Sequence, residues 1–162
     1  MNDARYVETN ARLPMLLSRI KPTGSPYQRH RPGCVITAMW WMHWPCLFPQ
    51  HGRGPKHTRR IALERWQQRI VHDQPAALLR GLFHSDGARV ANWATRPLKN
   101  GVTRRYAYPR WQFSNRSDDI HRICQDALDL AGVPWRRSSA VHTSVSTRAG
   151  VAALDALIGP KR

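Results

Sequence analysis

The sequence predicts an α+β protein whose second half follows the element order α-β-β-α-β-β-α. Three local signals support this prediction. A helical apolar pattern is bounded by Pro75, which suits a first helical turn, and by Gly87, which suits a helix end. Two alternating segments flank the pair Asn100-Gly101, which is typical of β-hairpin turns. Ser117 precedes two aspartates and has the character of a helix N-cap.

The N-terminal part, residues 1–48, has the elements of an incomplete repeat. Residues 4–20 have helical character that Pro14 weakens. Two short strands are predicted next, YQRH and CVIT, with a turn at Arg31-Pro32-Gly33 between them. An apolar, tryptophan-rich segment at 40–48 follows. Residues 4–48 therefore repeat the order of elements expected for 117–158.

The other elements are predicted in order from residue 49. A polar, glycine-containing segment at 49–60 marks the main boundary, and residues 49–74 are expected to be a linker that ends in a short helix at 63–74. Trp66 and Ile70 share a face of that helix, and we expect this face to pack on the next repeat. Residues 75–162 are predicted to form a complete repeat, with helices at 75–86, 118–131 and 148–158 and strands at 88–98, 104–115, 134–139 and 140–146.

The composition points to a polyanionic partner. The 162 residues include 26 Lys and Arg against 10 Asp and Glu, which gives a formal net charge of +16. Such a charge attracts nucleic acid, although a ribosomal or chromatin protein that binds by charge alone has the same character. Three widely spaced cysteines do not suggest a disulfide framework, and we expect a reducing, cytoplasmic location. The longest apolar stretch, ITAMWWMHWPCLF, is too short to span a membrane.

Charge is sorted along the second half of the chain. Residues 87–116 contain seven basic side chains and no acid. Residues 117–132 contain four aspartates and one arginine. The predicted strands are therefore basic and the helix between them is acidic, whereas an evenly solvated surface has no such segregation.

Alternation places the polar residues of the strands on one sheet face. In RRYAYPRWQFSN, the even-numbered positions from Arg104 to Gln112 fall on one side, while Ala107, Trp111 and Phe113 fall on the other and can pack on helices. Arg, Tyr, Gln and His bind phosphates and base edges, and a two-stranded ribbon fits the major groove of B-DNA. The ordinary alternative is a solvated sheet face. The predicted contacts to double-stranded DNA are Arg89, Arg96, Lys99, Arg104, Tyr106, Tyr108, Arg110, Gln112, Arg136, Arg137 and His142.

The predicted helix at 75–86 has a seam and an unfavourably placed acid. Gly81 and Ser85 share one face, where small residues let two backbones approach, and Leu78 and Leu82 flank that face. A carboxylate at a helix C-terminus is electrostatically unfavourable, so a cation near Asp86 would relieve it. Two such helices packed together would bring two Asp86 carboxylates to one end. Paired acids beside a phosphodiester bind a hard divalent cation.

The stretch LRGLFHSDG resembles the LAGLIDADG motif of the homing endonuclease family. The identical positions, five of nine, are Leu79, Gly81, Leu82, Asp86 and Gly87. Phe83 and Ser85 are conservative replacements, whereas His84 stands where many members have an acid and Arg80 replaces a small residue. The resemblance covers residues 76–158, whose expected order of elements is similar to the family's αββαββα repeat. Residues 3–50 resemble the tail of the first repeat in two-motif actinobacterial relatives.

The resemblance implies a DNA-binding fold with metal-dependent nuclease chemistry. In this family the motif helices form the interface of a homodimer or of two fused repeats, the last acid of each motif binds Mg²⁺, and the paired sheets form a saddle over DNA. Carried over to this chain, Asp86 is the catalytic metal ligand, and backbone carbonyls near Ser85 assist it. A homodimer through the motif helix would supply the second acid. The alternative is a cleavage-silent, sequence-selective DNA-binding protein or transcriptional regulator on the same fold.

Two further features have ordinary explanations. The residues Cys34, His43, Cys46, His51 and His57 are of zinc-ligand type, but their spacing is irregular and no C-x₂-C pair is present. We therefore expect a buried cysteine and linker histidines in place of a zinc site. The tryptophans at 40–44 are expected to cover the interface between the two halves, and stacking on single-stranded bases is the alternative.

Overall fold

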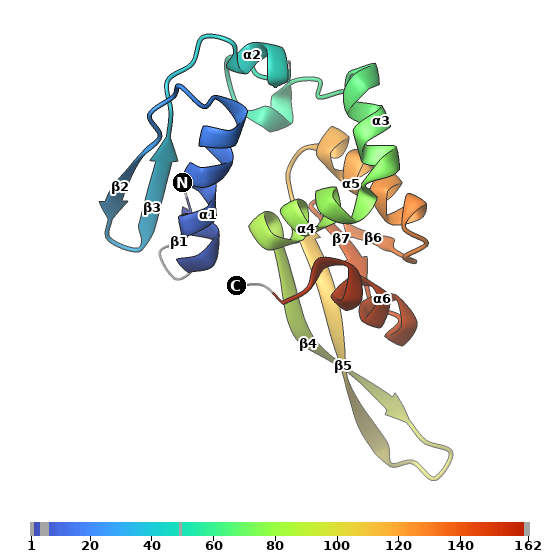
Figure 1. Ribbon diagram of the computed structural model, residues 1–162. Helices are drawn as coiled ribbons and strands as arrows, with labels where there is room; N and C mark the ends of the chain where they lie inside the picture. Colours follow the sequence, from blue (N-terminus) through green and yellow to red (C-terminus); the bar gives the residue numbers. More distant parts are fainter. Residues whose placement is uncertain (1, 4–6, 49, 161–162) are drawn as a thin grey trace. The chain divides into compact units, whose positions relative to one another are not determined.

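The computed structural model describes residues 2–3, 7–48 and 50–160 and has an α+β fold with two antiparallel sheets (Figure 1). The chain divides between His51 and Gly52 into two compact units. This division lies inside the polar segment 49–60. The short helix at the end of the predicted linker, α3 (Arg65–Asp73), belongs to the second unit.

The first unit is a small sheet with one long helix. Its elements are β1 (Asn2–Asp3), α1 (Val7–Ile20), β2 (Tyr27–Arg31), β3 (Cys34–Ala38) and α2 (Trp44–Leu47). The sheet order is β1-β3-β2, and α1 packs on β3. Gln28 Nε2 donates to the backbone carbonyl of Asn10 at 2.6 Å, so α1 is also tied to β2. The predicted helix and both strands are confirmed for the described residues. Residues 4–6 of the predicted helix lie outside them, and Pro14 is accommodated within α1.

The tryptophan-rich segment forms an aromatic cluster inside the first unit. The rings of Trp41 and Trp44 lie edge to face with their centroids 5.2 Å apart, and Trp44 Nε1 donates to the carbonyl of Met39 at 2.9 Å. Trp40 is 85% exposed. The predicted role of these residues between the two halves stays a prediction.

The second unit contains the predicted run of helices and strands. Its elements are a 3₁₀ turn at Lys56–Thr58, α3, α4 (Pro75–Asp86), β4 (Gly87–Pro97), β5 (Thr103–Ser114), α5 (Asp118–Leu130), β6 (Arg136–Ser139), β7 (His142–Val145) and α6 (Arg148–Ile158). The predicted N-cap is confirmed, because Ser117 Oγ accepts from the Ile120 N–H at 3.4 Å. Thr147 caps α6 in the same way by accepting from the Gly150 N–H at 3.1 Å.

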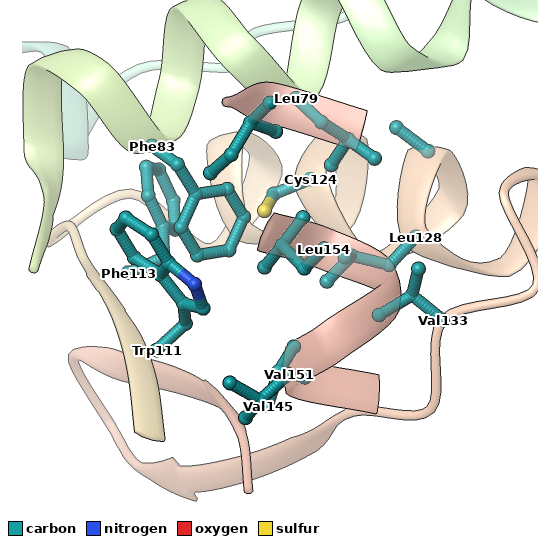
Figure 2. Close-up of a cluster of buried hydrophobic side chains, with 12 residues drawn as sticks. Leu79, Phe83, Trp111, Phe113, Cys124, Leu128, Val133, Val145, Val151 and Leu154 are labelled. Atoms are coloured by element: carbon teal, nitrogen blue, oxygen red, sulfur yellow. The ribbon is translucent and has the colours of Figure 1, made fainter. Parts of the chain in front are cut away.

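Three helices cover one face of the second sheet. The strand order is β4-β5-β7-β6, and α4, α5 and α6 pack together on the side to which Trp111 and Phe113 point (Figure 2). The aromatic ring of Phe83 on α4 meets both, with centroid distances of 5.7 Å to Trp111 and 5.8 Å to Phe113. The predicted packing of this side of β5 is therefore confirmed for Trp111 and Phe113, whereas Ala107, which was predicted to pack with them, is exposed. The core is completed by Leu79, Cys124, Ala127, Leu128, Val133, Val145, Val151, Leu154 and Ile158.

Helix α3 contacts α4 and α5 through a different face from the predicted one. Trp66 and Ile70 are 38% and 55% exposed. Val71, one residue further along, packs against the core of the unit. The predicted packing of this helix on the repeat is confirmed, but the face shared by Trp66 and Ile70 is not the one that reaches the core. A helix of nine residues laid on the outside of a helical layer buries one narrow stripe, and hydrophobic spacing alone does not select that stripe.

Strands β4 and β5 extend beyond the rest of the sheet as a two-stranded arm, residues 92–108, which projects from the sheet in Figure 1. Strand β7 pairs with β5 only from Trp111 to Ser114, so the arm has no third strand. The predicted hairpin is confirmed: the Gly101 N–H donates to the carbonyl of Leu98 at 3.0 Å, and Gly101 has a φ of 79°. Such a φ favours glycine, because a side chain there is strained.

A buried histidine links α5 to the sheet. His121 is fully buried; its Nε2 lies 3.0 Å from the backbone carbonyl of Asn115 and its Nδ1 lies 2.9 Å from Thr143 Oγ1. Because a carbonyl only accepts, Nε2 carries the hydrogen, and neutral Nδ1 accepts from the Thr143 hydroxyl. Thr143 Oγ1 in turn accepts from Gln125 Nε2 at 3.0 Å. The network is fully satisfied with a neutral imidazole.

This network predicts acid sensitivity. Burial, helped by the nearby Arg137, lowers the pKa of His121, against smaller opposing effects of hydrogen bonds and Asp118. At a pH below 6.5, the ordinary histidine pKa, the unfolded chain binds a proton at His121 that the folded chain binds less readily. The contribution of His121 to the free energy of unfolding is therefore complete above pH 6.5 and is lost as the pH falls below it. Urea unfolding should show a steeper loss of stability between about pH 7 and about pH 5 in wild type than in His121→Gln. Equal pH dependence in the two proteins would contradict this assignment.

Candidate nucleic-acid interface

The strand register leaves one face of the second sheet without helices, and we call this face the open face. Paired residues in antiparallel strands point to the same side. Because Trp111 and Phe113 point to the helices, Gln112 and its partners Ala88 and Ser144 point away from them. The polar and charged residues with this orientation are Asn92, Arg96, Arg104, Tyr106, Tyr108, Arg110, Gln112, Ser114, Arg136, Ser139, His142 and the buried Ser144.

Contacts along the open face orient its guanidinium groups. The Arg104 guanidinium lies 5.5 Å from the ring centroid of Tyr106. Arg110 donates to Gln112 Oε1 at 3.2 Å, and Asn92 Nδ2 donates to the Tyr108 hydroxyl at 2.8 Å. Arg110 Nε is buried and has no hydrogen-bond partner among the residues that the structure describes. These contacts fix the orientation of the Arg104 and Arg110 side chains on the open face.

Two predicted DNA contacts lie on the helix side and are already paired. Arg89 is opposite Trp111 and binds Asp155 of α6 through Nε at 3.0 Å and a terminal nitrogen at 2.9 Å. This hydrogen bond is the largest cause that lowers the pKa of the Asp155 carboxyl. Arg137 donates to Asp118 Oδ1 at 2.8 Å. Arg89 and Arg137 therefore do not share the open face with the other predicted contacts, because they pair with Trp111 and Thr143, which face the helices. Their contact with DNA stays a prediction.

Lys99 was predicted to contact DNA, whereas Asn92 was not. Lys99 lies in the exposed loop between β4 and β5. Asn92 was missed, although it is opposite Tyr108 in the register and lies on the same face as Arg96. Reading β4 with the same alternation as β5 would have found it.

The segregation of charge has a structural cause. Asp119 of α5 accepts from the backbone N–H of Ile61 at 2.7 Å and so anchors the segment that leads into α3. Asp129 accepts from Trp135 Nε1 at 2.7 Å. These two aspartates thus stabilise the helical layer, which lies on the opposite side of the sheet from the open face.

The motif helix α4 ends at the edge of the sheet. Asp86 is its last residue and is exposed, and Asn115 Nδ2 donates to Asp86 Oδ2 at 3.4 Å. Gly81 and Ser85 are exposed, as the predicted seam requires. Leu78 and Leu82, predicted to flank the seam, are partly buried against the core of their own unit. The surface of α4 left for another helix is therefore mainly the Gly81–Ser85 stripe.

The two glycines of the motif differ in their surroundings, which gives a matched prediction. A Cβ on Gly87 would lie 2.6 Å from the carbonyl oxygen and 2.7 Å from the Cα of Phe83, and neither backbone atom can move without distorting α4. A Cβ on Gly81 would have no neighbour within 4 Å. Gly87→Ala should lower the free energy of unfolding by about 2 kcal/mol or more. Gly81→Ala should raise it by about 0.5–1 kcal/mol. Thermal or urea unfolding followed by circular dichroism checks both, and similar behaviour of the two variants would contradict the strand start at Gly87.

Metal ligands are sparse within one copy of the chain. Within the described ranges, no group of three or more His, Cys, Asp or Glu side chains could hold a metal ion. Neither the predicted magnesium ligand Asp86 nor the zinc-type residues of 34–57 belong to such a group among the described residues. Ser85 Oγ is engaged with the carbonyl of Leu82 at 3.1 Å.

Comparisons of this chain with known protein families, with curated proteins and with solved structures give no match. Across the described residues, no helix combines the length and the apolar character needed to cross a membrane.

Proposed function

We propose that this protein binds double-stranded DNA through the open face of the second unit. The open face carries four arginines, and no Asp or Glu occurs among its described residues. Its members Arg96, Arg104, Arg110 and Arg136 come from three strands. Arginine binds phosphate with paired N–H groups, and the neighbouring Tyr, Gln and His side chains bind phosphates or base edges. The net charge of +16 provides the long-range attraction.

The shape of the sheet favours duplex DNA over other polyanions. The arm is a two-stranded ribbon, and the major groove of B-DNA accommodates such a ribbon. The arm carries Arg96 and Arg104 near its tip and Lys99 in its loop. Its open side would lie against base edges while the basic tip contacts phosphates.

Backbone amide shifts test the location of this interface. A duplex of random sequence should perturb the NMR signals of β4, β5 and β6 on titration, and should leave the outer surface of α5 unchanged. Perturbations centred on α5 and α6 would contradict the proposal. The side-chain Nε–H signal of Arg89 offers an internal control, because this group donates to Asp155 on the helix side and should be little affected.

We also propose that the second unit is an αββαββα repeat of the LAGLIDADG type. Three observations support this proposal. The elements from α4 to α6 follow that order, the motif spans the end of α4 and the start of β4, and the space at Gly87 admits no side chain.

Cleavage of DNA is the enzymatic version of this proposal. Asp86, with backbone carbonyls near Ser85, would hold Mg²⁺, which stabilises the charge that develops on a phosphodiester. One copy supplies one exposed carboxylate there, so a homodimer through the Gly81–Ser85 stripe would be required for two. The alternative is a cleavage-silent, sequence-selective DNA-binding protein or transcriptional regulator on the same fold.

A cleavage assay separates the two versions. Wild type and Asp86→Asn are incubated with a randomised DNA pool and Mg²⁺, and the solution mass of wild type is measured at the same concentration. The enzymatic version predicts a dimer whose cutting is lost in Asp86→Asn and on chelation. Binding without cutting by a monomer would support the silent version, and equal cutting by both proteins would exclude a role for Asp86.

A further inference from the structure

The arm is a structure that should not be stable by its strand pairing alone. From residue 92 to 108 it consists of β4 and β5 paired only with each other. An isolated two-stranded hairpin is marginal in water. If the arm contacts DNA, then its order in the free protein sets how much conformational entropy is lost on binding.

A contact on the rear side of the arm, which is the side opposite the open face, can stabilise the pairing of its two strands. Trp93 lies opposite Ala107, and Arg105 lies opposite Thr95, so Trp93 and Arg105 are diagonal neighbours across the two strands. The Arg105 guanidinium lies 4.6 Å from the ring centroid of Trp93, which is cation–π geometry. Trp93 remains 55% exposed. No helix covers this end of the hairpin, so the pair is the main side-chain contact on its rear side within the described residues.

Adjacent arginines on the arm therefore face opposite sides. Arg104 points to the open face, where it lies over Tyr106. Arg105 points to the rear, where it lies over Trp93. The sequence RR suggests one basic site, whereas the register gives two different environments.

We infer that Trp93 and Arg105 are positioning residues that hold the arm in its DNA-binding conformation without contacting DNA. The inference rests on the proposed function. An exposed cation–π pair contributes enough to change a conformational equilibrium about two- to fivefold. Loss of the pair should weaken DNA binding by this factor. Phosphate contacts are unchanged by that loss, so the salt dependence of binding stays the same.

The test compares a rear residue with an open-face residue in the full chain. Trp93→Ala should weaken duplex binding about two- to fivefold at every salt concentration, with an unchanged slope of log affinity against log salt. In the free protein, amide hydrogen exchange at residues 98–102 should be faster by a similar factor. Arg104→Ala should instead reduce the slope by about 0.9. Exchange in the free protein should change little, because the ring under Arg104 is that of Tyr106 on the same strand, so this contact does not link β4 to β5. Trp93→Tyr keeps an aromatic face and should restore most of both properties.

The outcomes separate the inference from the proposed function. Weaker binding by Trp93→Ala without faster exchange would show direct contact with DNA and overturn the inference. Unchanged exchange together with unchanged affinity would also overturn it. Faster exchange that is additive in the double variant Trp93→Ala/Arg105→Ala would contradict a coupled pair. Absence of salt-dependent DNA binding by wild type would overturn the proposed function, while the exchange data would still report whether the pair orders the arm.

Discussion

Replacing Phe83 with alanine is expected to lower the free energy of unfolding of the second unit by about 3–5 kcal/mol. The side chain is completely buried and its ring meets those of Trp111 and Phe113. Truncation removes the transfer free energy of the ring and leaves a cavity between α4 and β5. Because the free energy of unfolding of a domain is only about 5–15 kcal/mol, this one substitution should remove a large part of it.

Chemical denaturation followed by tryptophan fluorescence measures this effect, since Trp111 is in contact with the substituted position. Ile70→Ala is the matched control: Ile70 is 55% exposed on α3, and its truncation should change stability by about 0.5 kcal/mol or less. A loss below about 1 kcal/mol for Phe83→Ala would mean that α4 does not pack on the sheet as described.

Replacing Arg104 and Arg110 together with glutamine is expected to reduce the slope of log affinity against log salt by about 1.8 for duplex DNA. Both side chains lie on the open face, and each is expected to neutralise one phosphate. Affinity at low salt should fall about tenfold or more. Glutamine is shorter than arginine but remains polar and can still donate a hydrogen bond, so the main loss is the positive charge.

The matched control removes the same charge from the helix side. Arg65→Gln/Arg69→Gln alters two exposed arginines on α3, which packs on α4 and α5. This variant should retain nearly the wild-type slope. Fluorescence anisotropy with a labelled duplex across a salt series measures both proteins. Equal loss in the two variants would indicate binding by net charge alone, as in the simplest interpretation of the composition.

Much of the second unit could be predicted because its local signals agree with its tertiary structure. Pro75, Ser117 and the Asn100-Gly101 pair mark element ends through backbone chemistry that acts over a few residues. The alternation of β5 was readable because two large residues on one side, Trp111 and Phe113, are buried. Helix α3 was harder: three apolar residues on a short outer helix leave the buried stripe undetermined, and packing on α4 selects Val71.

The candidate interface was predicted in composition but not in every position. Arg89 and Arg137 were grouped with the other basic residues because charge along a strand does not show which side a residue faces. Their partners Asp155 and Asp118 are distant in sequence and come together only in the fold. Arg104 and Arg105 point to opposite sides because they are consecutive residues of a strand, and the dipeptide alone does not show which side each one faces.

The most direct measurement of the central claim is the affinity of the wild-type chain for a random duplex across a range of salt concentrations. The open face carries four arginines, Arg96, Arg104, Arg110 and Arg136, and the arm adds Lys99. If each arginine neutralises one phosphate, log affinity should fall against log salt with a slope of about −3.6 or steeper. Affinity that does not change with salt, or no binding to duplex DNA at low salt, would contradict the claim that the open face is a DNA-binding surface.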